Sequence, residues 1–220
     1  MRKATSSATI SRDALEPYAV TDPVHARTHL VREPGEPAVG WSGWRFSPRR
    51  VEGEVLRDSL LFVSGALNPQ QGGPGFEDVK EIHFNAGRYY HPIVREGSEF
   101  DRRTIYRFTP RGGRDSLLDG FDCPDPSTTT PARTVTTTPL QALSLLNNSF
   151  VLRMAGHLGK RVARAAGANV MKQVRRAYDL TLGRQPDAEE EALAVKLVER
   201  HGAAALGRAL CNSNEFVVSQ

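Results

Sequence analysis

Two aspartates in a proline-rich stretch have side chains that could do chemistry. Asp122 and Asp125 lie three positions apart in FDCPDPS, residues 121–127. Each proline fixes its own φ and pushes the preceding residue toward extended geometry, so this loop is stiff. Paired carboxylates could act as general acid and base, or could bind a hard cation. The alternative, which the many nearby arginines favour, is that Arg102, Arg103 or Arg133 donates paired hydrogen bonds to them and locks the loop in place.

Histidines and cysteines, the other residues with metal or redox chemistry, form no recognised motif. His83 and His91 lie eight positions apart and could join one of the aspartates around a metal, but no third ligand follows at helical or hairpin spacing. Cys123 and Cys211 could form one long-range disulfide in an oxidising compartment, or could remain free thiols. The sequence contains no CxxCH haem motif and no HExxH motif. We therefore predict neither a metal nor a cofactor in this chain.

Basic residues are concentrated where acidic ones are missing. The chain of 220 residues has a net charge of +4, yet no acidic residue lies between Asp125 and Asp179. A helix expected after Ser149 has an apolar stripe and, on its other face, only basic residues: Arg153, His157, Lys160, Arg161 and Arg164. This face could bind an anion such as an acidic or sulfated glycan, or neighbouring acidic helices could complement it. A nucleic-acid partner is not expected, because the sequence shows no helix-turn-helix, zinc-finger or RNP pattern.

The acidic loop leads into a helix with clear start signals. Thr138 is the expected N-cap, Pro139 suits the first helical position, and Gln141 completes a T-x-x-Q capping box. Asn147-Asn148 should end this helix, and Ser149 should cap the next one. The side of the helix that we expect to face the core consists of Leu140, Ala142, Leu143 and Leu146.

Helical periodicity recurs along the chain from residue 47. A first helix is expected from Ser47-Pro48 to Asn68-Pro69, and later ones over 170–183, after Asp187, and around 206–216. The segments 81–91 and 104–108 have strand composition. Short connections between the later helices predict antiparallel packing. The predicted fold class is mainly α: an irregular N-terminal extension and a Pro/Thr-rich loop packed on an antiparallel bundle of short helices, with at most a few short strands.

The chain divides into two predicted regions. Residues 1–46 are poorly periodic and form an irregular extension, in which Trp41 and Trp44 either stack on a sugar or base or anchor a loop. Residues 47–220 form the helical domain. No apolar run approaches the ~18 residues of a membrane span. The first residues, MRKATSSATI, lack the apolar centre of a secretory signal, so the sequence by itself does not establish a location.

Several segments, in this order, carry a resemblance to a known family: RRVEGEVLRDSLLFVSGALN, RRTIYRF, FDCPDPS, ARTVTTTPLQALSLLNNSFV, RRAYDLTLGRQPDAEE and ALCNSNEF. Over roughly residues 45–220 the chain resembles the domain of unknown function 1553 family. The resemblance implies the C-terminal part of a large planctomycete protein, exported or in the cell envelope. In such a protein a domain of unknown function 1549, and often a cytochrome c-like haem domain, comes first. This sequence lacks those parts, so we expect that it could be a truncated product.

The resemblance brings no established catalytic residues, but it supports a core constellation of Asp122, Asp125, Arg133, Thr138 and Gln141. Three hypotheses for function follow. The first is a non-catalytic domain that binds or scaffolds other domains of a larger assembly. The second is binding or degradation of acidic or sulfated polysaccharide, with Arg153, Lys160, Arg161 and Arg164 holding the anion. The third is a hydrolase that uses Asp122 and Asp125.

Overall fold

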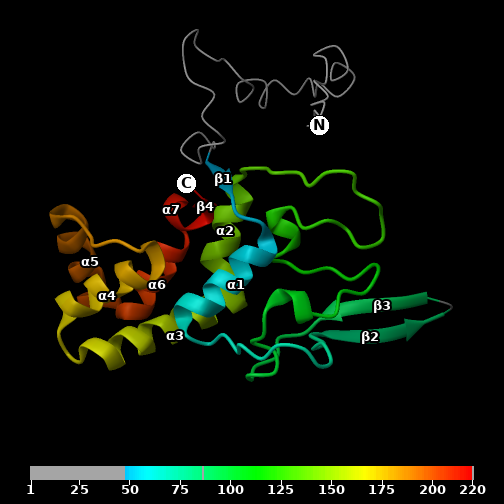
Figure 1. Cartoon of the computed structure of the whole chain (residues 1–220), viewed down its shortest axis with the longest axis horizontal. Helices are drawn as coiled ribbons and strands as arrows, with labels where there is room; N and C mark the ends of the chain where they lie inside the picture. The colour runs from blue at the N-terminus through cyan, green and yellow to red at the C-terminus, as the bar shows by residue number, and fades with distance from the viewer. Residues whose placement is uncertain (1–47, 86, 220) are drawn as a thin grey trace, which may run out of the picture. The chain divides into compact units, whose positions relative to one another are not determined.

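A computed structural model describes residues 48–85 and 87–219 (Figure 1). In this part of the chain the helices are α1 (Gly53–Ser64), α2 (Pro139–Asn147), α3 (Ser149–Ala166), α4 (Val170–Leu182), α5 (Ala188–His201), α6 (Ala203–Cys211) and α7 (Asn214–Val217). Two small antiparallel sheets accompany them, so the predicted, mainly α fold class is confirmed. The predicted extension over residues 1–46, with Trp41 and Trp44, lies outside the described residues, and that domain boundary stays a prediction.

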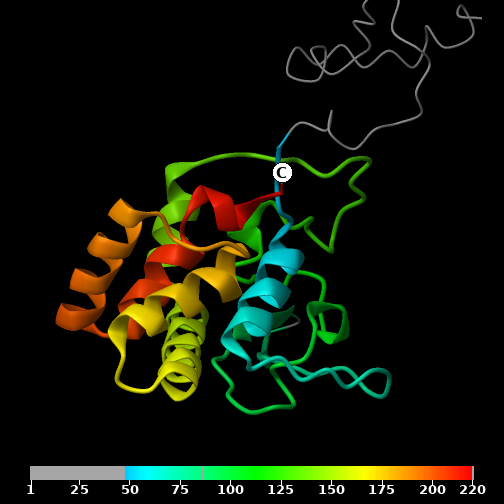
Figure 2. The ribbon, with the colours of Figure 1, turned by 60° about the vertical axis from the view of Figure 1, so that its left-hand side comes forward.

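Helix α3 is the central element because two clusters of buried side chains share its apolar stripe. Its first half, with Val151 and Met154, packs in one cluster with α1, whereas Leu158 and Val162 pack in the other with α4, α5 and α6 (Figure 2). Burial of a large aliphatic side chain contributes about 1.5–3 kcal/mol. Gly159 permits the close approach of α6, since a Cβ there would lie 2.8 Å from the backbone nitrogen of Ala204.

The first and last described residues pair with each other. Strand β1 (Arg49–Arg50) runs antiparallel to β4 (Val218–Ser219), and the N–H of Val51 donates to the carbonyl of Val217 at 2.9 Å. This pairing corrects the start of the first helix, which we expected at Ser47-Pro48. Helix α1 begins instead at Gly53, because the residues before it are used as a strand. Its C-terminal end is at Gly65, in the left-handed conformation with φ 76°.

Two segments with strand composition have different outcomes. The region 81–91 does form strands: β2 (Val79–Phe84) pairs with β3 (Gly87–Pro92) in a hairpin that extends away from the helices (Figure 1). The region 104–108 does not, since Thr104–Tyr106 is a short 3₁₀ turn. Asp58 of α1 explains the difference, because its Oδ1 accepts hydrogen bonds from both the backbone N–H and the hydroxyl of Thr104, at 2.7 and 2.6 Å.

The expected core face of α2 was wrong. Leu140 and Leu143 are 74% and 53% exposed, while Gln141 and Leu145 are each 1% exposed. The helix turns this way because buried Gln141 finds hydrogen-bond partners that an apolar side chain could not use, as shown below. The cap of α3 also differs: the side chain of Asn148, not of Ser149, accepts from the N–H of Phe150.

The helices near the C-terminus follow the sequence signals closely. Helix α4 ends at Gly183, with φ 68°, as predicted. The Asp187 side chain caps α5 in an acidic capping box with Glu190. The last predicted helix is divided into α6 and α7 by residues 212–213. Among the described helices, none has both the length and the apolar character needed to cross a lipid bilayer.

Candidate functional site

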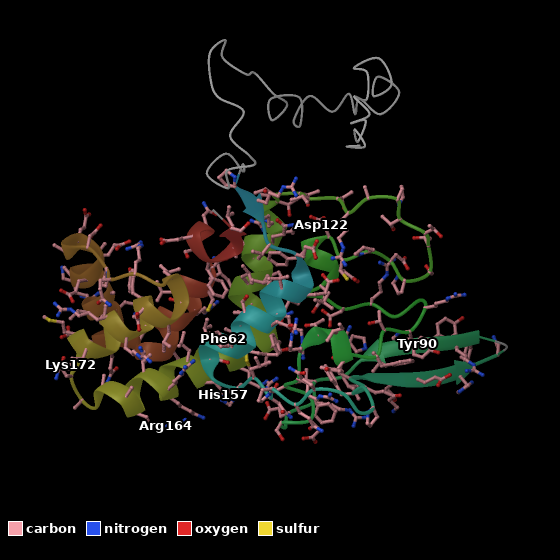
Figure 3. All side chains as sticks on the ribbon, viewed as in Figure 1. Phe62, Tyr90, Asp122, His157, Arg164 and Lys172 are labelled. Atoms are coloured by element: carbon pink, nitrogen blue, oxygen red, sulfur yellow. The ribbon has the colours of Figure 1, made fainter. Side chains whose placement is uncertain are left out.

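Asp122 lies at a strained turn and is bound by a threonine. It follows the 3₁₀ turn Asp119–Phe121 with φ 60° and ψ 26°, the left-handed region that aspartate and asparagine tolerate better than most residues. One carboxylate oxygen accepts from the N–H of Thr136 at 2.7 Å, and the Thr136 hydroxyl lies 2.9 Å from each oxygen. Figure 3 shows Asp122 on the side of the domain where α2 begins. Asp122 therefore joins the start of the Pro/Thr-rich loop to its end.

Gln141 extends this network into the interior. Its Nε2 donates to the Thr136 hydroxyl at 3.3 Å, and its Oε1 accepts from the N–H of Thr138 at 3.1 Å and from Arg50 at 2.6 Å. Burial lowers the pKa of Arg50, and the nearby charge of Asp122 partly offsets this effect. The hollow between Arg50, Asp122 and Arg133 measures only about 20 Å³. That is room for about one water molecule.

Arg133 and Cys123 complete the surroundings of the loop. Arg133 donates to Glu54 at 2.9 Å and to Glu52 at 3.1 Å, and this bonding lowers the pKa of Glu54. The Cys123 thiol donates to Glu54 at 3.6 Å. Burial, reinforced by the Glu54 charge, raises the pKa of Cys123 to about 11, so it remains a protonated thiol at neutral pH. Cys123 and Cys211 are both free, so the disulfide alternative is not realised in this structure.

The expectation that Arg102, Arg103 or Arg133 holds the two aspartates was wrong. Arg102 donates to the carbonyls of Gly72 and Pro74, at 2.5 and 2.7 Å, and Arg103 lies 3.3 Å from Asp58. These two arginines bind the loop after α1 and α1 itself, and Arg133 binds the glutamates at the start of α1.

Asp125 stands apart from Asp122. It accepts from the backbone N–H and hydroxyl of Ser127, at 2.8 and 2.5 Å, and this lowers its pKa. The guanidinium of Arg114, on an exposed side chain, lies 3.2 Å from its other oxygen. The structure thus brings Asp122, Thr138 and Gln141 into one network with Thr136 and Arg50, and leaves Asp125 outside it.

The two histidines lie on the hairpin. His83 pairs with Arg88 and His91 with Lys80, which places the histidines on opposite faces of the two strands. The nearest acidic neighbour of His83 is Glu81, at 3.3 Å. Among residues 48–85 and 87–219, no group of three or more His, Cys, Asp or Glu side chains could hold a metal ion.

The sequence did not predict a group of buried ion pairs beside α1. Arg153 donates two hydrogen bonds to Asp101, at 2.8 and 2.9 Å, and both side chains are largely buried. Arg107 bridges Asp78, at 2.8 Å, and Asp115, at 3.0 Å. One feature of the sequence indicates a buried charge here. Arg57 lies three positions before Leu60 and four before Leu61, so it falls on the buried side of α1.

The basic face of α3 divides into bound and exposed residues. Arg153 is used by Asp101, and Arg161 donates to the carbonyls of Phe62 and Val63, at 3.0 and 2.7 Å, at the end of α1. Lys160 and Arg164 are exposed, as is Lys172 of α4. Figure 3 shows His157, Arg164 and Lys172 along the side formed by α3 and its turn into α4, with Phe62 nearby on α1. Further along α4, Arg175 and Arg176 pair with Glu191 and Asp179.

Comparison with known proteins gives one match. The family model described as "PSD1: Protein of unknown function (DUF1553)" matches residues 40–198. No curated protein and no solved structure matches the chain.

Proposed function

The chain belongs to the PSD1 family of proteins of unknown function (DUF1553), and we propose that it is a non-catalytic binding module of a larger protein. Its ligand is an acidic polymer, with acidic or sulfated polysaccharide the chemistry that fits best. The binding surface consists of Lys160, Arg164 and Lys172, and is called the α3–α4 basic surface below. Within an exported protein such a surface would attach the module, and the domains joined to it, to an anionic matrix.

One observation supports this proposal above the others. No acidic residue occurs from position 126 to position 178, so α3 has no carboxylate of its own to neutralise these cations. The bound arginines of the α3 face, Arg153 and Arg161, hold the fold together, whereas Lys160 and Arg164 of α3 and Lys172 of α4 are exposed. A cluster of like charges creates a local potential that attracts a long polyanion, even though each exposed contact contributes only ~0.2–1 kcal/mol.

The geometry of the acidic loop favours binding over hydrolysis. A hydrolase centred on Asp122 and Asp125 needs both carboxylates directed at one substrate. Here Asp122 is taken up by Thr136 and Asp125 by Ser127 and Arg114, and the adjacent hollow of about 20 Å³ has no room for a sugar ring. In this arrangement the loop is a structural clamp, meaning that the Asp122–Thr136 hydrogen bonds hold the chain in place just before α2.

Affinity chromatography of the full chain on immobilised heparin, with a salt gradient, tests the proposal. The variant Lys160→Gln/Arg164→Gln/Lys172→Gln should bind about 3- to 100-fold more weakly, from the loss of three exposed contacts, and should elute at lower salt. The matched control Lys80→Gln/Arg88→Gln/Arg111→Gln removes the same charge from exposed positions elsewhere. Wild-type protein that fails to bind heparin, or equal shifts in both triple variants, would refute the proposed surface.

A further inference from the structure

The hairpin of β2 and β3 is a sheet of only two strands. It extends away from the helices (Figure 1), and among residues 48–85 and 87–219 no third strand joins it. Every residue from Lys80 to Phe84 is exposed. A hairpin of two strands is only marginally stable in water unless further strands or a packed helix support it. The described fold therefore leaves this hairpin without the support that such an element needs.

The backbone hydrogen bonds of the hairpin show which groups point to its open edges. The N–H of Ile93 donates to the carbonyl of Asp78 at 2.8 Å, so these two residues form a hydrogen-bonded pair at the base of the hairpin. Hydrogen-bonded and non-hydrogen-bonded pairs alternate along an antiparallel ladder. Glu81 and His83, further along β2, therefore belong to non-hydrogen-bonded pairs and direct their N–H and C=O groups away from β3. These groups are free to pair with another strand.

The outer edge of β3 is less suited to pairing than the outer edge of β2. By the same alternation Pro92, opposite Val79, lies in a non-hydrogen-bonded pair, so its nitrogen faces the outer edge of β3. Proline has no N–H to donate there, and a proline on an edge strand hinders pairing with a further strand. The six residues of β2 include no proline. The open edge of this hairpin is therefore that of β2.

The residues of β2 are complementary to a second copy of the same strand. When two β2 strands run antiparallel with their Ile82 residues opposite each other, Glu81 of each copy faces His83 of the other. Each of these two pairs exchanges two backbone hydrogen bonds and places a carboxylate opposite an imidazole. A register centred on Glu81 would instead oppose two carboxylates, which is destabilising. A register centred on His83 would place Glu81 opposite Asn85 and lose both charge-complementary pairs.

The exposed apolar side chains of the hairpin favour the same register. Ile82 and Tyr89 lie opposite each other within the hairpin, and they are 39% and 53% exposed. In the paired copies the two isoleucines meet and the tyrosines flank them, so an apolar row crosses four strands on one face. Lys80 of each copy lies opposite Phe84 of the other, which is 66% exposed, and the lysine stem and ammonium can pack on that ring. Apolar and charged side chains thus select one register.

The contacts that Glu81 makes within one chain are compatible with this pairing. His83 and Arg88 lie 3.3 and 3.5 Å from the Glu81 carboxylate, and all three side chains are exposed. Ion pairs between exposed groups are weak, so they do not hold Glu81 in one position. The three side chains share one face of the hairpin, and His83 of the second copy approaches on that face. It adds a partner to Glu81 and displaces none.

We propose that the β2 edge is the interface of a homodimer. Two hairpins join into one four-stranded antiparallel sheet in the order β3–β2–β2–β3, with a two-fold axis between the Ile82 residues. Two short strands form a contact below the ~1,200 Å² of a standard interface, so the dimer is weak, with a Kd of about 10–100 µM. The interface uses none of the residues of the α3–α4 basic surface. The inference therefore goes beyond the proposed function and does not depend on it.

Sedimentation equilibrium of the full chain, at concentrations from about 5 to 500 µM, tests the dimer because this range brackets the expected Kd. His83→Glu opposes carboxylates twice across the axis and should weaken the dimer by ~10-fold or more. Glu81→Lys should also weaken it, because a lysine then faces the imidazole. An equimolar mixture of the two variants is the decisive sample. In a mixed dimer the new lysine of one copy faces the new glutamate of the other, so the mixture should associate with a Kd within ~5-fold of wild type.

His91→Glu is the matched control, since it makes the same change on the other strand. His91 is exposed and lies on β3 opposite Lys80, one strand away from the β2 edge, so this variant should dimerise as wild type does. Circular dichroism checks that each variant is folded. The proposal is overturned if wild-type protein stays monomeric at about 500 µM, well above the expected Kd. It is also overturned if the mixture associates no better than its components, or if His91→Glu loses as much affinity as His83→Glu.

Discussion

Replacement of Asp122 by asparagine tests whether the acidic loop is a structural clamp. Asparagine has nearly the same shape and accepts the left-handed backbone that Asp122 adopts at φ 60°, so the turn itself should not be strained. The change acts on the Thr136 contacts. One of the two oxygens becomes an NH₂ group. The remaining oxygen, in the position that accepts from both the N–H at 2.7 Å and the hydroxyl at 2.9 Å, keeps these hydrogen bonds, but it is neutral and the bonds are weaker.

The expected loss follows from these two hydrogen bonds. A hydrogen bond to a charged group contributes about 1.5–3 kcal/mol, against about 0.5–1.5 kcal/mol for one between neutral groups, and the partial exposure of Asp122 reduces this difference. We expect Asp122→Asn to lower the free energy of unfolding by about 1–2 kcal/mol. For a folded region of this size the melting temperature should fall by about 2–8 °C. Asp125→Asn keeps an oxygen for Ser127 and loses only the exposed Arg114 pair, so a smaller loss of stability than for Asp122→Asn is expected.

Urea denaturation followed by circular dichroism measures both variants. A double-mutant cycle with Thr136→Val should show a coupling of about 1 kcal/mol between positions 122 and 136, and none between 125 and 136. If Asp122→Asn unfolds at the wild-type midpoint, or if Asp125→Asn is the more destabilised variant, the clamp is refuted. An Asp122→Asn variant as stable as wild type would make the acidic loop a candidate catalytic site again.

Three further predictions concern charges and a thiol elsewhere in the fold. Arg153→Met leaves buried Asp101 without its partner, so it should lower the free energy of unfolding by about 3–5 kcal/mol, and a loss below ~1 kcal/mol in urea denaturation would contradict this. Burial raises the pKa of Cys211 from 9.0 to about 12, so its thiol should react with a disulfide reagent at about pH 8 only after unfolding. The stability that Cys211 contributes should decline as the pH rises above 9.0, because the thiol ionises more readily in the unfolded chain. Rapid labelling of native protein at this position would show that the core is open there. Hydrogen bonds from Arg184 lower the pKa of Glu190 from 4.5 to about 2. The stability that this carboxylate contributes is therefore present above pH 4.5 and is lost as the pH falls toward 2. In acid titrations, Glu190→Gln should lose less stability over that pH range than wild type.

Several of the described arginines connect separate segments of the fold. Arg57, Arg102 and Arg161 donate to backbone carbonyls of other segments, with shortest distances of 2.9, 2.5 and 2.7 Å. The planar guanidinium offers several donors in fixed directions and stays charged when buried, which suits it to joining irregular loops to helices. The excess of basic residues in the sequence therefore overstates the positive surface of the folded domain.

Local signals in the sequence determined several of the helix ends. Asp187 with Glu190 predicts the start of α5, Gly183 the end of α4, and Thr138 with Gln141 the start of α2. Each of these features depends on residues three or four positions apart, so a short window of sequence contains the whole interaction. The mainly α fold class follows from the same local patterns.

Tertiary structure decided the partners. Arg153 meets Asp101 from 52 positions away, Arg50 meets Gln141 from 91, and Arg161 meets Val63 from 98. Several arginines precede or follow the acidic loop in sequence, and the folded chain determined which carboxylate or carbonyl each one reached. The rotation of α2 that buries Gln141 and exposes Leu140 depends in part on a distant partner, because the buried amide binds Arg50 in addition to the nearby Thr136 and Thr138. Hydrogen bonds and ion pairs act over a few ångströms, so their partners are set by the folded chain and not by the spacing of residues along it.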